Sequence, residues 1–252
     1  MSLFEHPFNE HIRTYLRLEH LFARLRELIA GETALYHHFA LVTVFDIMEA
    51  TNRPDLKSHV LHALEKQKGF LSGFRNQPGV SAASLDATLK HLAQVFGNLQ
   101  AQQGKPGQDL ASNEWLMAVR NRLTIPGGTC SFDLPSYAAW QRRDPEHRRA
   151  DLQQWTQSLR PMEAAITLLL QILRSSTDHA QMIVADKGTL QLKVPRSRSV
   201  QLLRLELDDA SPLVPEISGN QLLLSIRMMR PSASGELQAT TEDTPLKITL
   251  CA

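Results

Sequence analysis

Residues 161–194 have the sequence PMEAAITLLLQILRSSTDHAQMIVADKGTLQLKV, and the periodicity of the chain changes within this stretch. Up to about Ser175 the apolar residues recur at helical spacing. Beyond it, the short apolar runs 182–185 and 189–194 flank Asp186-Lys187-Gly188, which predicts a short β-hairpin. The change from helical to strand patterning near residue 178 therefore divides the chain.

Upstream of this division the apolar spacing is helical. Asn9 suits the N-cap of the first helix, and Asp144-Pro145 has the form of an N-cap followed by proline at the first helical position. The polar segment 101–109 is predicted to be a loop. The predicted helices cover residues 9–29, 34–50, 55–71, 84–102, 113–123, 145–158 and 161–175.

Downstream of the division the pattern is that of strands joined by turns. Further strands are predicted at 201–207, 221–229, 237–241 and 246–250, with a turn at 232–235. Because the helices come first and the strands afterwards, the order predicts an α+β fold with segregated layers. We expect an N-terminal all-helical domain at 1–178 and a mainly antiparallel β domain at 179–252.

The charge of the chain is nearly balanced. Among 252 residues there are 27 Lys and Arg against 26 Asp and Glu, a formal net charge of +1. The segment 179–252 is balanced by itself, with eight basic and eight acidic side chains. Affinity for phosphate backbones grows with the number of neutralised phosphates, so this balance argues against a protein that coats nucleic acid by bulk charge.

The sequence gives few indications of the cellular compartment. The two cysteines, Cys130 and Cys251, indicate reduced thiols, and Cys130 is expected to be a small buried hydrophobe. The N-terminus lacks the pattern of a secretory signal, and the longest apolar stretch, 164–173, is too short for a transmembrane helix. We expect a soluble, cytoplasmic protein without a membrane partner.

The chain offers little for catalysis or metal binding. His59, His62 and Glu65 fall on one predicted helix, which is more typical of a solvated helix face than of a zinc site. No nucleophile elbow, phosphate-binding loop or dinucleotide fingerprint is present. Pro126-Gly127-Gly128 is interpreted as a tight turn with one glycine at positive φ. We expect no catalytic residue, no metal and no cofactor.

Basic side chains form a stripe on the first predicted helix. At roughly 100° per residue, Arg13, Arg17 and Arg24 lie on one side, with only Glu10 at the margin. The apolar residues gather on nearly the opposite side. The stripe is either a solvated face or a site for carboxylates, which arginine forks bind in a bidentate manner.

Further arginines occupy fixed positions in the pattern. Arg120 and Arg122 immediately precede the Pro126-Gly127-Gly128 turn. Strand alternation places Arg227 opposite the face of Leu222, Leu224, Ile226 and Met228, and Arg204 opposite Leu203, Leu205 and Leu207. Together these side chains could form an acid-binding surface.

Several blocks of sequence have a familiar form. Phe4-Glu5-His6-Pro7 precedes Arg13-Thr14 and Leu16-Arg17-Leu18-Glu19, and residues 120–135 are RNRLTIPGGTCSFDLP. Leu203-Arg204-Leu205, the block 215–219 and Ile226-Arg227 follow in order. These blocks resemble the ZapD family of Z-ring-associated bacterial cell-division proteins. Two departures are Tyr15, where the family often has Trp, and Gln221, where a lysine is expected.

The resemblance implies a non-enzymatic role. ZapD-like proteins are homodimers, with a helical and a β domain, that bind the C-terminal tail of FtsZ and crosslink its filaments into bundles at midcell. On this basis the candidate tail-binding residues are Arg13, Arg17, Arg120, Arg122, Arg204 and Arg227. Arg17 and Arg227 are the first choices, and the Pro126-Gly127-Gly128 corner and Phe132 are expected to be structural.

Two rival functions use the same residues differently. A nucleic-acid-binding module would use the same arginines, but the chain lacks a basic excess and aromatic residues interleaved on the basic face. A hydrolase would be built on His59, His62 or Cys130 and would need a bound metal or a perturbed thiol in a deep pocket.

Overall fold

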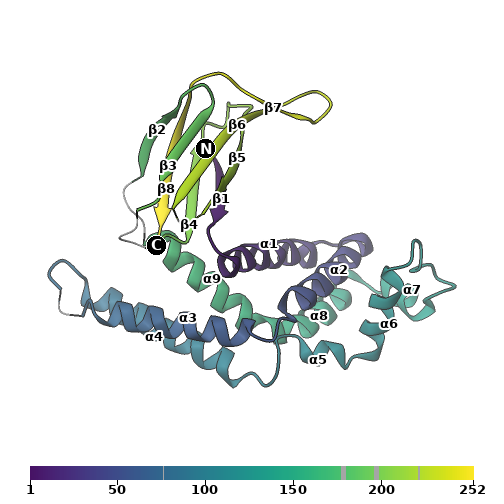
Figure 1. Cartoon of the computed structure of the whole chain (residues 1–252). Helices are drawn as coiled ribbons and strands as arrows, with labels where there is room; N and C mark the ends of the chain where they lie inside the picture. The colour runs from purple at the N-terminus through teal and green to yellow at the C-terminus, as the bar shows by residue number, and fades with distance from the viewer. Residues whose placement is uncertain (76, 177–179, 196–198, 221) are drawn as a thin grey trace. The chain divides into compact units, whose positions relative to one another are not determined.

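The computed structural model describes residues 1–252 except 76, 177–179, 196–198 and 221. The described residues form two compact units, 1–16 with 170–252, and 17–169. After one N-terminal strand, helices occupy the first part of the chain and antiparallel strands follow (Figure 1), so the predicted α+β class is confirmed. Among the described residues, no helix combines the length and apolar composition that a bilayer crossing requires.

The boundary between residues 178 and 179 that separates the two predicted domains lies outside the described residues. The N-terminal strand β1 (Ser2–Pro7) pairs with β4 (Leu202–Leu207), so the first residues of the chain join the β-rich unit. Helices α1 (Glu10–Ala30) and α9 (Arg160–Ser175) contribute residues to both units. The division into domains of separate function stays a prediction.

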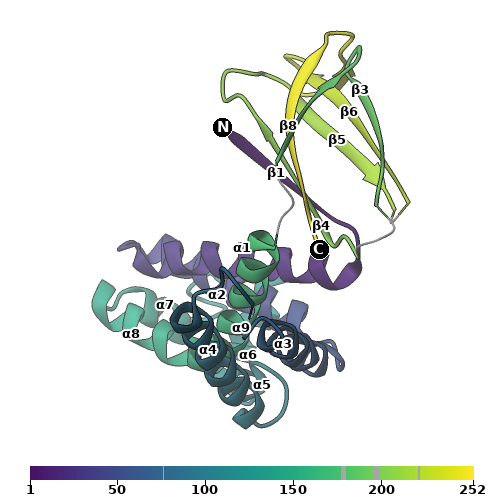
Figure 2. The same cartoon turned by 90° about the vertical axis from the view of Figure 1, so that its left-hand side faces the viewer.

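The helical unit is built from α1 and α9 and the helices between them. α2 packs against α6 and α8, and α3 and α4 lie side by side as a helical hairpin (Figures 1 and 2). The bounds are α2 (Ala34–Thr51), α3 (Leu56–Ser72), α4 (Ala82–Ala101), α5 (Gln108–Ala111), α6 (Glu114–Leu123), α7 (Pro135–Gln141) and α8 (Pro145–Trp155), followed by a 3-10 turn, Thr156–Leu159.

Local signals fix several helix ends. The Asn9 side chain accepts a hydrogen bond from the Ile12 amide at 2.9 Å, as an N-cap does, and Asn113 accepts one from the Leu116 amide at 3.0 Å. The predicted cap at Asn9 is therefore confirmed. The helix α7 is not predicted from the sequence. Helix α8 ends at Trp155 rather than at Ser158 because the chain tightens into the 3-10 turn.

The strands of the described residues form two four-stranded sheets, all pairs antiparallel. One has the order β1-β4-β8-β2; the other has the order β3-β6-β5, with β7 also paired to β6. Figure 2 shows β3, β6 and β5 side by side. The remaining bounds are β2 (Gln181–Ala185), β3 (Thr189–Lys193), β5 (Val214–Gly219), β6 (Leu223–Pro231), β7 (Leu237–Ala239) and β8 (Thr244–Cys251).

One apolar cluster joins the two sheets. Leu203 and Leu205 from the first sheet and Leu224, Ile226 and Met228 from the second are fully buried in it. The sheets therefore pack as a sandwich, with polar residues alternating outward. The face predicted for β6 is confirmed from Leu224 onward, whereas the predicted strand start, residue 221, lies outside the described residues.

The predicted hairpin at Asp186-Lys187-Gly188 is wrong beyond its turn. β2 pairs with β8 in one sheet and β3 pairs with β6 in the other, so the two arms are linked at the turn by the isolated bridge between Asp186 and Thr189 rather than by a hairpin ladder. The turn itself is as expected, because Lys187 and Gly188 both have positive φ. β5, which the sequence analysis does not predict, pairs with β6 along its whole length.

Candidate functional site

The six candidate arginines are distributed over both units. Arg13, Arg204 and Arg227 belong to the β-rich unit, and Arg17, Arg120 and Arg122 belong to the helical unit. Their partners decide how readily each guanidinium could accept a new carboxylate.

On helix α1 the three stripe arginines differ in their partners. Arg13 Nε donates to Glu10 Oε1 at 3.0 Å, and the Arg24 guanidinium contacts Asp46 Oδ2 at 2.5 Å. Arg17 is exposed and makes no ion pair within the part of the chain that the structure describes. The stripe is thus neutralised at one end by Glu10, which helical spacing places at its margin, and at the other by Asp46 of α2, which that spacing does not reveal. Arg17 between them is the guanidinium open to a partner.

Arg120 and Arg122 occupy the last turn of α6. Arg120 Nη2 donates to Glu49 Oε2 at 2.9 Å, and Arg122 Nη1 lies 3.5 Å from Asp133 Oδ1. Cations in this position also interact favourably with the negative end of the helix dipole. Both side chains remain partly exposed, so each ion pair is of the solvent-screened kind that contributes little to stability.

The chain turns sharply after α6, as predicted. Gly127 has φ +71°, which confirms the expected glycine at positive φ. A Cβ on Gly128 would lie 2.4 Å from the Arg122 carbonyl oxygen, so the corner requires glycine there too. Phe132, expected to be structural, is instead 83% exposed, and Cys130, expected to be buried, is exposed as well. Both expectations fail because the turns carry these side chains away from the core.

Arg204 belongs to a partly buried ionic cluster. Glu5 lies directly opposite it in the β1–β4 register, with Oε1 3.3 Å from Arg204 Nε. Arg174 Nε and Nη2 donate to the two oxygens of the same carboxylate at 2.8 and 2.6 Å. Glu5 is 15% exposed, and its carboxylate is shared by the guanidiniums of Arg174 and Arg204. The sequence pattern gives no sign of Arg174 as a member.

The nearby Cys251 is buried at the end of β8. Burial raises the pKa of its thiol to about 11. It is therefore a neutral, inert thiol at physiological pH.

Arg227 lies on the solvent face of β6. In the register it stands between Thr189 on β3 and Glu216 on β5, and its Nη1 lies 3.6 Å from Glu216 Oε2. The side chain is 57% exposed. Arg227 is thus accessible, with one loose carboxylate partner, on the face that strand alternation predicts.

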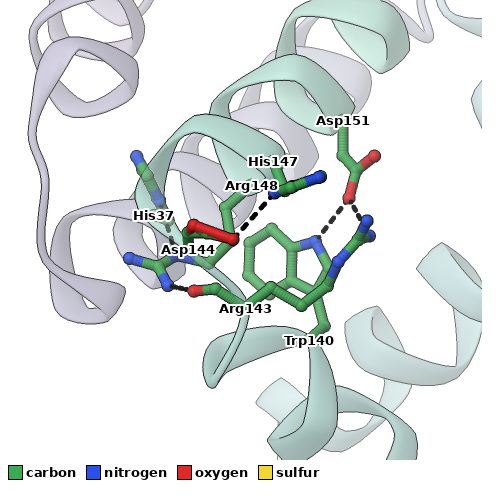
Figure 3. A network of polar contacts seen from close by, with 7 residues as sticks. All are labelled: His37, Trp140, Arg143, Asp144, His147, Arg148 and Asp151. Atoms are coloured by element: carbon green, nitrogen blue, oxygen red, sulfur yellow. Dashed lines mark hydrogen bonds and ion pairs between the residues drawn. The ribbon is translucent and has the colours of Figure 1, made fainter.

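Sequence reasoning misses a buried arginine in the helical unit. Arg148 is 4% exposed, and its Nε donates to His37 Nδ1 at 2.9 Å (Figure 3). Its other nitrogens donate to the carbonyl oxygens of Glu32 at 2.8 Å, Gln141 at 3.0 Å and Arg143. Burial, with the Arg148 charge beside it, lowers the pKa of His37. His37 is therefore held neutral, and the network ties the start of α2 to α8.

Outer members of this network anchor α7. Asp151 accepts hydrogen bonds from Trp140 Nε1 at 3.0 Å and from Arg143 Nη1 at 2.9 Å (Figure 3). Trp140 in turn packs with Trp115 and Trp155, at ring-centroid distances of 5.6 and 5.9 Å. These contacts are those of a scaffold rather than of a catalytic centre.

Among the described residues, no three His, Cys, Asp or Glu side chains are grouped so that they could hold a metal ion, His59, His62 and Glu65 included.

Comparisons with known proteins point in one direction. A family model described as "ZapD: Cell division protein" matches residues 16–227, which include every candidate arginine except Arg13. The chain is 43% identical to the cell division protein ZapD of Janthinobacterium sp. (strain Marseille) over 252 residues, covering all of both proteins. It is 41% identical over 249 residues to the cell division protein ZapD of Aromatoleum aromaticum, covering 99% of this chain and 96% of that protein.

Proposed function

Because this chain belongs to the ZapD family of cell division proteins, we propose that it binds the C-terminal tail of FtsZ and crosslinks FtsZ filaments into bundles at the division site. In this proposal it is a homodimer that acts in the cytoplasm, at midcell, without enzymatic chemistry. A two-fold dimer presents two identical tail sites to different filaments. Because each filament carries many tails, modest affinity at one site becomes strong bundling through effective concentration.

The observation that supports the proposal most directly is the exposure of Arg17 and the ion pairing around it. This exposed guanidinium, inside the segment that matches the family model, has no ion-pair partner among the described residues. An arginine fork in that state binds a carboxylate in a bidentate manner without first giving up an internal partner. An acidic peptide is the ligand that such a group fits.

The other candidate arginines support the proposal to different degrees. Arg227, Arg120 and Arg122 hold partners in ion pairs that water screens, so exchanging that carboxylate for one from a tail costs little. Arg204 is 27% exposed and is held by Glu5, so it contributes through its field more than through direct contact. Attraction of this kind weakens as salt rises.

Charge reversal of the two first choices tests the proposal. Arg17→Glu with Arg227→Glu is expected to abolish pelleting of FtsZ bundles in a sedimentation assay, with the dimer and the helix content unchanged. A matched control reverses two exposed basic residues elsewhere, Arg75→Glu and Lys187→Glu, one in each unit, and is expected to bundle normally. Undiminished bundling by the folded Arg17/Arg227 variant would contradict the assignment of these two residues.

A further inference from the structure

The loop 124–134, between α6 and α7 in Figure 1, exposes two large apolar side chains. Phe132 is 83% exposed and Ile125 is 48% exposed. No large apolar side chain among the described residues is more exposed than Phe132. An aromatic ring carries the kind of apolar area that dominates interface energetics, so its presentation to solvent calls for a physical reason.

The backbone of the loop holds this presentation in place. The Gly128 amide donates to the Ile125 carbonyl at 2.9 Å, and the Cys130 amide donates to the Gly127 carbonyl at 3.1 Å. The Asp133 amide then donates to the Cys130 carbonyl at 3.0 Å. Successive turns of this kind fix the loop before any ligand arrives, which lowers the entropy cost of binding.

One guanidinium of α6 reaches the loop at the residue next to Phe132. Arg122 Nη1 lies 3.5 Å from Asp133 Oδ1, and Asp133 directly follows Phe132 in the chain. Arg120, two residues earlier on α6, is paired instead with Glu49 on α2. A guanidinium has five N–H donors. The contact with Asp133 occupies only part of that capacity in Arg122. The exposed apolar side chains and the donors of Arg122 therefore belong to the same turn-rich corner.

We propose that Ile125, Phe132 and Arg122 form a docking surface, here called the corner surface, for an acidic peptide in which an apolar side chain adjoins a carboxylate. Phe132 and Ile125 cover the apolar side chain, and Arg122 binds the carboxylate. This inference rests on the proposed function, in which the FtsZ tail is that peptide. It adds that the tail is held by apolar contact as well as by charge.

The local charges favour a peptide over a lipid surface. Anionic bilayers attract clusters of several basic residues, whereas Arg120 and Arg122 are accompanied here by the carboxylates of Glu49 and Asp133. These carboxylates weaken the attraction to an anionic bilayer, because the lipid head groups that approach the arginines are also repelled by Glu49 and Asp133. A peptide avoids this cost, since a single carboxylate needs to approach only Arg122.

Binding of a fluorescein-labelled synthetic peptide of the FtsZ C-terminal tail tests the inference, with the full chain and fluorescence anisotropy. Phe132→Ala is expected to raise Kd about tenfold, the loss that follows from removing one ring from a covered apolar contact. Phe132→Leu is expected to keep most of the affinity. The matched control, Phe70→Ala, removes a ring that is 60% exposed on α3 and is expected to leave Kd unchanged. Circular dichroism checks that each variant is folded.

The outcomes separate the inference from the proposed function. Absence of peptide binding by the unmodified protein overturns both. Binding by the unmodified protein that Phe132→Ala leaves unchanged overturns the corner surface alone. Vesicles of phosphatidylcholine with phosphatidylglycerol provide the remaining test. If Phe132→Ala weakens vesicle binding but leaves the peptide Kd unchanged, the loop binds a membrane and the inference is overturned.

Discussion

Glu5 on β1 and Arg204 on β4 face each other across the sheet, with Glu5 Oε1 3.3 Å from Arg204 Nε. The same carboxylate accepts two hydrogen bonds from Arg174. A residue near the start of the chain and one after residue 200 are thus joined through a partly buried cluster of charged side chains. Strand β1 is held in the sheet by the contacts of Glu5 with these two arginines as well as by its backbone pairing with β4.

Removing the shared carboxylate is expected to destabilise the protein. Glu5→Ala leaves two guanidiniums without their common partner, at a cost of about 2 kcal/mol in the free energy of unfolding. The cost stays below that of a fully buried pair because Arg174 and Arg204 keep 23% and 27% of their side-chain exposure. Urea denaturation followed by circular dichroism measures it. Glu10→Ala, which removes the exposed partner of Arg13, is the control, and equal losses in the two variants would speak against the cluster.

Truncation of Arg148 is expected to be more severe. Arg148→Ala leaves His37 and three carbonyl oxygens without their buried donor, which costs on the order of 3 kcal/mol. Arg148→Lys is expected to recover only part of this, because an ammonium lacks the planar fork. Thermal unfolding compares both with Arg142→Ala, an exposed neighbour. A melting temperature unchanged by Arg148→Ala would show that the network of Figure 3 adds nothing to stability.

The buried His37 predicts a loss of stability in acid. Its pKa is lowered in the folded state from a usual value of 6.5, so the unfolded chain binds the proton more readily. The stabilising contribution is present above about pH 6.5 and is lost as the pH falls below that value toward the folded-state pKa. Urea midpoints at several pH values down to about 5 measure this loss. His37→Gln is expected to flatten the dependence, whereas His147→Gln, at an exposed position, is expected to keep it; identical slopes in all three proteins would contradict the account.

Regular patterns made most of the fold predictable. Asn9 and Asn113 mark helix starts through a local hydrogen bond, and strand alternation places Leu224, Ile226 and Met228 inward, because these signals depend on neighbours in sequence. The pairing of strands depends on distant partners. For this reason the apparent hairpin at residues 186–188 divides between two sheets.

The candidate site was predictable in residue type but not in partners. Helical spacing gives the side on which Arg13, Arg17 and Arg24 lie, yet it does not show that Glu10 and Asp46 neutralise two of them. Nor does a motif reveal exposure: Phe132 lies in a block rich in turns, and only the backbone path shows that its ring faces solvent. Such facts come from tertiary contacts, which local periodicity does not encode.

Co-sedimentation of this protein with FtsZ filaments, with and without the FtsZ C-terminal tail, tests the central claim most directly. At low salt we expect bundles of full-length FtsZ to pellet with the protein, with less pelleted at high salt because salt screens the contacts between arginine and carboxylate groups. Tail-truncated FtsZ is expected to leave the protein in the supernatant at both salt concentrations. Equal pelleting with full-length and tail-truncated filaments would contradict the account.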